Sequence, residues 1–478
     1  MRDLLLVFLA VGGLAVWALL RWRPAVPAVL GLLVVEGAVR KWLVPEQQEI
    51  VYFAKDVLLL AIYCGYLLDR RRRSLPRSLK LPIFHILLAL FAAWCALEVF
   101  NPRLPNLLVG LLGFKAYLWY VPLVWVVPAA FDNDHQLARF LRRYALLAIP
   151  VGLLATAQFF SPRTSALNVY ARTSEDVAGL AGFAGSEFVR TTGTFSYITG
   201  FSTFLQVIAL LLLTVLAVTR WRLRNNLLIY VATLFTILGA FMSGSRAPVL
   251  AIALTVPVFV WLSFLRRQEG FKVFARMGLA VGILAAAVGF GGADAVSVFY
   301  ARATDTPDAV GRILAPFVEP FAVLDRAGLL GYGAGATHQA AAVVAPGLRP
   351  YGWLNGPLLE VETSRVLLEL GAIGFLLTYL VRLYLVVLAL RQLIALRRPF
   401  HRGVATASLF FFLMSIPGAV VFNVTADVYY WFFAGLLFTA MRLERRIATS
   451  PATELAAAER HTAGSTGPCL PGLQPGSP

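Results

Sequence analysis

The chain has 478 residues, of which 59% are hydrophobic and only 14% are charged, and its mean hydropathy is +0.75. This composition excludes a soluble globular domain and predicts an all-α protein, a polytopic membrane helix bundle. The formal net charge of +17 does not indicate a nucleic-acid partner, because the Lys and Arg residues fall in short clusters between apolar runs and form no basic domain.

Apolar runs bounded by charged or turn-forming residues predict about 12–13 transmembrane helices. The predicted spans lie near residues 4–20, 24–44, 51–68, 81–100, 106–130, 140–160, 197–219, 225–242, 248–265, 277–293, 361–390, 403–421 and 423–441. Since no small-residue cleavage site follows residues 4–20, we expect this first run to be retained as a span. The spans and their connections form a predicted transmembrane helical domain over residues 1–449.

The last stretch, residues 450–478, is rich in Ala, Thr, Gly, Ser and Pro and shows no periodicity that would bury a face. We expect it to form a disordered cytoplasmic tail. Of the 3 cysteines, Cys64 and Cys95 fall inside predicted spans and Cys469 falls in the tail. No disulfide or metal-binding framework is therefore indicated.

Short basic connections set the predicted orientation. The Lys and Arg clusters fall on one side of the membrane under this span assignment, at 69–80, 220–224, 266–276, 391–402 and 442–446. The excess of Lys and Arg in short loops marks the cytoplasmic side. We therefore expect the long connections 161–196 and 294–360 to face outward, with the N-terminus outside and the C-terminus inside.

Charged residues inside spans are costly and are functional candidates by default. Glu36 and Arg40 stand four residues apart, so they either form an ion pair that makes a polar turn tolerable or serve a ligand. Lys115 lies in a predicted span, where it either snorkels to the membrane surface or faces a cavity. The candidates map to the outward half of the predicted bundle.

Two arginines are expected at the outward ends of spans. Arg190 precedes TTGTFSYITGF, and Arg246 lies in the turn MSGSRAP between two spans. A guanidinium group offers a bidentate fork and stays charged at any working pH, which suits a diphosphate. The alternative is contact with lipid head groups.

The stretch PLLEVETSRVLLELGAIG, residues 357–374, carries four charged residues into an apolar run. In a helix that begins near Pro357, positions 362, 365 and 369 share one face, so two acids and a base would point the same way. Gly371 and Gly374 would allow a neighbouring helix to approach closely. The glycines of GYGAG, residues 331–335, follow no strand and open no clear helix, so they are not typical of a phosphate-binding loop.

The order of these motifs resembles the O-antigen ligase and O-antigen polymerase superfamily. The resemblance covers RTTGTFSYITGF, SGSRAP, the long outward loop with GYGAG, and the pattern E-x-E-x-x-R-x-x-x-E-x-G-x-x-G that opens the next span. In that superfamily a His-Asn pair typically precedes the first glycine, where this chain has Glu360 and Val361. The departure fits a polymerase, or a branch with a carboxylate in the histidine position, better than a ligase of the usual type.

The resemblance implies a glycosyltransferase of the bacterial inner (plasma) membrane, with an active site that faces the periplasm. Its donor would be a saccharide linked to a polyprenyl diphosphate such as undecaprenyl diphosphate, and its acceptor a glycan or lipid of the cell envelope, as in cell-surface polysaccharide biosynthesis. The predicted donor-binding residues are Arg190, Arg246, Arg365, Lys115 and Arg40. Glu360, or else Glu362, would accept the proton of the acceptor hydroxyl.

No metal ion or other cofactor is expected, because two or three arginines can neutralise the charge that develops on the leaving diphosphate. The motif HExxH, typical of metal-dependent enzymes, is absent from the sequence. The alternative is a transporter or flippase for a lipid-linked saccharide or another anion. Internal repeats and charges near the midplane are typical of transporters, whereas the charges here cluster on one side, which favours the enzyme.

Overall fold

A computed structural model describes residues 2–69, 81–171, 182–183, 186–218, 223–265, 282, 289, 292–304, 309–338 and 361–448 of the chain. Apart from one isolated antiparallel bridge between Gly182 and Val189, these described residues form helices and loops and no strand. The predicted all-α fold class is confirmed. The helices are α1 (Arg2–Leu20), α2 (Trp22–Ala38), η1 (Val39–Leu43), η2 (Pro45–Gln47), α3 (Gln48–Leu68), α4 (Pro82–Glu98), α5 (Leu107–Leu118), α6 (Leu123–Ala130), α7 (Asp134–Ala145), α8 (Ala148–Phe160), α9 (Ile198–Val218), α10 (Leu223–Met242), α11 (Arg246–Leu265), α13 (Ala293–Thr304), α14 (Ala309–Ala327), α16 (Glu362–Ala395), α17 (Pro399–Ser415) and α18 (Val424–Ala448).

Six helical segments among the described residues are long and apolar enough to cross a membrane, and the bent pair α5–α6 is a candidate for a seventh. Three further apolar helices, Leu4–Leu20, Pro82–Glu98 and Asn226–Met242, are shorter. Twelve of the thirteen predicted spans coincide with a described helix or helix pair, while the span 277–293 lies largely outside the described residues. The chain is thus a multi-pass membrane helix bundle.

The predicted span 106–130 is broken rather than continuous. Helix α5 ends at Leu118, α6 begins at Leu123, and the two axes differ by 41°. Pro122 stands at the N-terminal end of α6, and a proline there lacks the N–H that a continuous helix would need. The break directs α5 and α6 toward different neighbours.

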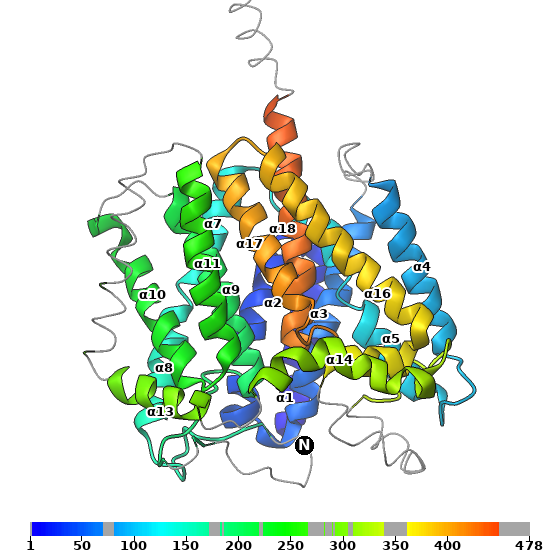
Figure 1. The fold of residues 1–478 in the computed structure, drawn as a ribbon, viewed down its shortest axis with the longest axis horizontal. Helices are drawn as coiled ribbons and strands as arrows, with labels where there is room; N and C mark the ends of the chain where they lie inside the picture. Colours follow the sequence, from blue (N-terminus) through cyan, green and yellow to red (C-terminus); the bar gives the residue numbers. More distant parts are fainter. Residues whose placement is uncertain are drawn as a thin grey trace, which may run out of the picture.

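Helix α18 occupies the centre of the bundle (Figure 1), where it contacts α6, α9, α16 and α17. Its aromatic side chains, among them Tyr429, Phe432 and Phe433, are fully buried. A helix that is apolar around its whole circumference is expected where other helices surround it on all sides. The core of the bundle is therefore built on the last predicted span.

Helix α16 is sharply bent at Gly371, whose backbone has φ 65°. A Cβ atom at this position would lie 2.1 Å from the carbonyl oxygen of Leu329. Because a glycine has no Cβ, the backbone N–H of Ala372 can reach Gly328 O at 3.0 Å. The close approach predicted at Gly371 is confirmed, but the neighbour is the loop after α14 rather than a helix.

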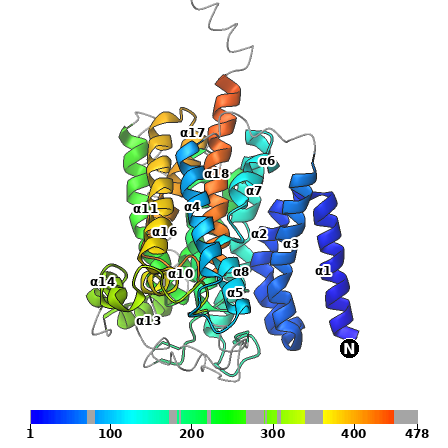
Figure 2. The ribbon, with the colours of Figure 1, turned by 90° about the vertical axis from the view of Figure 1, so that its right-hand side faces the viewer.

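One end of the bundle gathers the N-terminus, the described loop residues of 161–197, helices α13 and α14, and the start of α16 (Figures 1 and 2). We call it the loop end, and the opposite end, where α18 finishes, the tail end. The predicted outward segments 161–196 and 294–360 thus share one end in their described parts. The second segment was predicted as a loop, but it contains α13 and α14.

Candidate functional site

The described site residues predicted from the sequence fall into three groups in the loop-end half of the bundle. The groups are Arg190 with Arg246, Arg40 with Lys115, and Glu362 with Arg365. Glu360, the first choice for the base, lies outside the described residues.

The first group is a cluster of arginines. The backbone of Thr191 donates to Met242 O at 3.1 Å, which holds the chain after Arg190 against the end of α10. Arg190 Nε donates to Ser243 O at 3.1 Å. Gly244, with φ 60°, forms the turn beside it, and a Cβ there would lie 2.8 Å from Arg190 Nε. Glycine is thus required for the turn that receives Arg190.

A third arginine completes this cluster. Arg246, the first residue of α11, donates from Nη2 to the carbonyl oxygen of Arg302 at 3.4 Å, and Arg302 lies in the last turn of α13. Sequence reasoning missed Arg302, because it assigned residues 294–360 to a loop. The helical pattern of residues 293–304, with a basic residue near its end, was the signal available.

We define the arginine cluster as Arg190, Arg246 and Arg302. Burial and, to a smaller extent, the nearby positive charge of Arg302 lower the pKa of Arg190 to about 10. Arg190 forms no ion pair with a carboxylate among the described residues. It is still protonated at neutral pH, so an anion bound here would relieve both the repulsion and the loss of hydration.

The second group is a buried ion-pair network between α2, α3 and α5. Glu36 pairs with Lys55 at 3.2 Å and with Arg40 at 3.7 Å. Lys115 Nζ lies 2.5 Å from Asp56 Oδ2. The side chain of Lys115 therefore points into the bundle and does not snorkel. The i, i+4 pair expected for Glu36 and Arg40 is present.

This network limits what Arg40 and Lys115 offer a ligand. Arg40 also donates to Ser196 Oγ at 3.0 Å and is 5% exposed. The side chain of Lys115 is 20% exposed and its charge is already matched by Asp56. Breaking such buried pairs leaves an uncompensated charge, so we assign both residues to holding the helices together beside the site.

The third group lies in the first half of α16. Glu362 Oε1 lies 2.5 Å from Arg382, and Glu362 Oε2 accepts the backbone N–H groups of Val420 at 2.7 Å and Phe422 at 3.1 Å. The 20 residues between Glu362 and Arg382 would extend about 30 Å in a straight helix. The contact exists because the bend at Gly371 folds the two halves of α16 together.

Arg365 and Glu369 turn to a different partner from Glu362. Arg365 donates to Thr337 Oγ1 at 3.1 Å and to Thr337 O at 2.7 Å. Glu369 Oε1 accepts the N–H of Thr337 at 2.8 Å and its hydroxyl at 2.6 Å. Positions 362, 365 and 369 all precede the bend at Gly371, so they lie on one side of the first half of α16, but Glu362 pairs with Arg382 and not with Arg365.

The glycine loop 331–335 lies against Glu369. Gly335 N donates to Glu369 Oε2 at 3.0 Å, and Tyr117 Oη donates to the same oxygen at 2.9 Å. His338 follows this loop, and burial together with the positive charges of Lys115 and Arg365 lowers its pKa to about 4. The His338 imidazole is thus neutral at pH 7, and it lies near charged residues of both the second and the third group.

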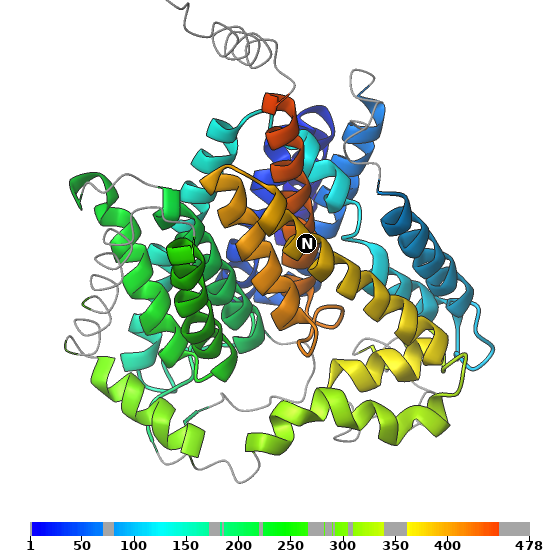
Figure 3. The same ribbon diagram turned by 45° about the horizontal axis from the view of Figure 1, so that its top comes forward.

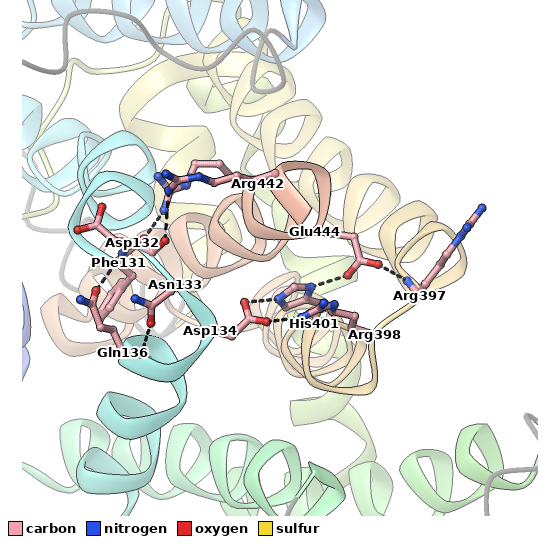
Figure 4. Close-up of polar contacts among 11 residues, drawn as sticks. Phe131, Asp132, Asn133, Asp134, Gln136, Arg397, Arg398, His401, Arg442 and Glu444 are labelled. Carbon is pink, nitrogen blue, oxygen red and sulfur yellow. Dashed lines mark hydrogen bonds and ion pairs between the residues drawn. The ribbon is translucent and has the colours of Figure 1, made fainter. Parts of the chain in front are cut away.

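A separate polar cluster lies at the tail end (Figure 4). His401 is fully buried, with Asp134 Oδ1 at 2.8 Å from Nε2 and Glu444 Oε2 at 2.5 Å from Nδ1. Arg398 pairs with the other oxygen of Asp134 at 3.0 Å. The cluster joins α7, α17 and α18, so we assign it to the packing of the tail end and not to the site.

The described site residues are better suited to binding an anion than to acid–base catalysis. Both oxygens of Glu362 and of Glu369 are occupied by internal hydrogen bonds or ion pairs, which leaves neither free to accept a proton from a ligand. The arginine cluster brings together arginines from three segments, and Arg190 forms no ion pair with a described carboxylate. No family model matches the chain, and no curated protein matches it.

Proposed function

We propose that the chain is a membrane-embedded glycosyltransferase of the O-antigen ligase and polymerase kind. It transfers a saccharide from a polyprenyl diphosphate to a hydroxyl of a glycan or lipid acceptor at the loop end. The proposed place is the periplasmic face of a bacterial inner membrane. The observation that carries the proposal is the arginine cluster, in which three separate segments bring Arg190, Arg246 and Arg302 together.

The chemistry explains why such a cluster would serve this reaction. The bond between the sugar C1 atom and the diphosphate oxygen breaks, C1 forms a bond to the acceptor oxygen, and the lipid diphosphate leaves with the bonding electron pair. Negative charge grows on the diphosphate, and fixed guanidinium groups in a partly dehydrated site stabilise it. Two parallel N–H bonds from one arginine fit two phosphate oxygens.

The acceptor proton needs a base, and we propose Glu360 for this role. Its slot in the motif is that of the superfamily histidine. Glu362, the other carboxylate proposed from the sequence, is better explained as a positioning residue, since Arg382 and two backbone N–H groups use both of its oxygens. Arg365 stacks with its guanidinium carbon 3.5 Å from the ring centre of Phe422, which supports a positioning role for it as well.

The test uses purified protein in liposomes with a polyprenyl-diphosphate-linked saccharide and its acceptor. Replacing Arg190 or Arg302 by Lys keeps the charge but removes the fork, so we expect transfer to fall by at least about tenfold, or about 1.4 kcal/mol. The matched control is Arg163→Lys, an exposed arginine at the same end that donates to Ser186 O. It should transfer normally.

Two results count against the proposal. If Arg190→Lys and Arg302→Lys transfer as well as Arg163→Lys, the cluster does not hold the leaving group. If cells that lack the protein accumulate the lipid-linked saccharide on the cytoplasmic leaflet, the chain moves the lipid, and the transporter alternative replaces the enzyme.

A further inference from the structure

Helix α14 runs crosswise to α16, α17 and α18 at the loop end (Figure 1), and it reaches outward past the start of α16 (Figures 2 and 3). One face packs on the first half of α16. Val323 and Ala327 are fully buried there, against Leu367 and Leu368. This contact holds α14 at the edge of the bundle rather than over its centre.

The opposite face of α14 is apolar and exposed. Its residues recur at the spacing of one helical face. They are Leu314, Phe317, Val318, Phe321 and Leu324, of which Phe321 is 74% exposed and Val318 is 60% exposed. Leu329 and Leu330 continue the apolar surface into the turn that follows, with 66% and 57% exposure. Contiguous exposed apolar surface of this kind marks a contact with a membrane or another protein.

The lipid-facing surface of α16 runs up to α14. The second half of α16 crosses the membrane and exposes a row of large apolar side chains, among them Leu376, Leu383, Leu390 and Ile394. At the bend below this row, Ala372 N donates to Gly328 O at 3.0 Å, so α16 meets the turn that directly follows α14. Among the side chains of α14 that the structure describes, the exposed charged ones are Asp325 and Arg326, which stand together in its last turn. This arrangement is typical of a helix in the interface plane, with apolar and aromatic side chains on one face.

We infer that α14 is an interfacial helix, whose face of Leu314, Phe317, Val318 and Phe321 inserts into the boundary between head groups and acyl chains of the leaflet at the loop end. The partner is the phospholipid bilayer itself. The sequence predicted an outward-facing loop here. The inference does not depend on the proposed function, because it rests on the packing and exposure of α14 alone.

Spin labels can measure the surroundings of this face. Cysteines replace Phe317 and Phe321, one at a time, in the full chain with its 3 native cysteines changed to serine. The chain is placed in liposomes of phosphatidylcholine and phosphatidylglycerol. Collision rates of the label with oxygen, which concentrates in lipid, are compared with those of a water-soluble nickel chelate. Matched controls are Leu383 on the lipid-facing row and Thr164 in the exposed loop.

We expect the ratio of oxygen to nickel collisions at Phe317 and Phe321 to lie with that of Leu383 and to exceed that of Thr164 several-fold. A ratio equal to that of Thr164 would mean that the face lies in water and would overturn the inference. Magnetic coupling between labels on two copies would overturn it as well, because a second copy of the chain would then cover the face.

A second measurement is available if the cysteine variants do not fold. Benzoylphenylalanine keeps the aromatic side chain when it replaces Phe321, and it forms covalent adducts with its neighbours on illumination. Adducts with radiolabelled phospholipid are expected. Adducts that join two protein chains, or the absence of lipid adducts beside a positive control at Leu383, would contradict the inference.

Discussion

Glu362→Gln separates a catalytic role of this carboxylate from a role in positioning. Glu362 and Arg382 are each 3% exposed and lie 2.5 Å apart, so solvent screens them little. Removing the charge of Glu362 leaves the guanidinium of Arg382 buried without its counter-ion. Breaking a buried pair in this way costs about 3–5 kcal/mol, and the lower value of about 3 kcal/mol is expected because the amide oxygen still accepts a backbone N–H. A loss of this size is a factor of roughly 100 or more in the folding equilibrium.

The assay is unfolding of the detergent-purified chain, followed by the loss of its monomer peak in size-exclusion chromatography as denaturant is added. Glu49→Gln, which changes an exposed glutamate in the first turn of α3, is the matched control and should unfold as the parent does. Changing Arg382 to Gln as well should recover most of the lost stability, because no charge then remains buried.

The opposite pattern would refute this reasoning. If Glu362→Gln is as stable as Glu49→Gln and yet transfers no saccharide, Glu362 acts in the chemistry, as the sequence alone suggested. If it is unstable but the folded fraction transfers within about tenfold of the parent, or about 1.4 kcal/mol, the positioning role holds.

Four further outcomes are expected. Gly371→Ala should destabilise the chain by at least about 1–3 kcal/mol in the same unfolding assay, because φ is 65° and Leu329 O occupies the place of a Cβ atom. The control Gly12→Ala has open space around its Cβ position and should not change the stability. Equal stabilities of the two variants would contradict the bend at Gly371. Arg246→Lys should lose transfer in the liposome assay because an ammonium group has no fork, and normal transfer would make Arg246 a lipid-contact residue. Stability should fall as pH drops from 6.5 toward 4, because the pKa of His338 is about 4 in the folded chain, below its ordinary value of 6.5, and the unfolded chain therefore binds the proton more readily. The His338→Gln variant should lose less stability over that window, and an unchanged pH profile would contradict the assignment. In intact cells, a cysteine at Thr164 should react with an impermeant thiol reagent while one at Arg397 should not, and the reverse would invert the orientation.

Apolar run length predicted nearly all of the spans, because a helix in lipid must satisfy its own backbone hydrogen bonds and cover itself with apolar side chains. The same reasoning placed Arg190 and Arg246 at one end of the bundle, since residues at corresponding ends of alternate spans share a side. The local signals were weaker where backbone geometry departs from a straight helix. Pro122 was available as a sign of the broken span, and Arg302 as a basic residue near the end of an unrecognised helix.

The partners of Glu362 in α16 show what periodicity does not predict. Positions 362, 365 and 369 all precede the bend at Gly371, so periodicity predicts the side of the helix they occupy, but it does not predict that the bend brings Arg382 beside Glu362. A glycine permits a positive φ but does not require one. The positive φ of Gly371 is required here because Gly328 and Leu329, which lie in an earlier segment of the chain, pack directly against this part of α16.

The sequence by itself determined that the protein is a multi-pass helix bundle and predicted which of its ends carries the arginines, since both follow from hydrophobic length and the alternation of spans. Only the tertiary structure decided which charged side chains form ion pairs or hydrogen bonds with partners inside the protein. Glu362, Arg365, Arg40 and Lys115 each meet a partner from a distant segment, while Arg190 meets none among the described carboxylates. Such pairings depend on distances between segments far apart in the chain, and no local pattern of residues encodes those distances.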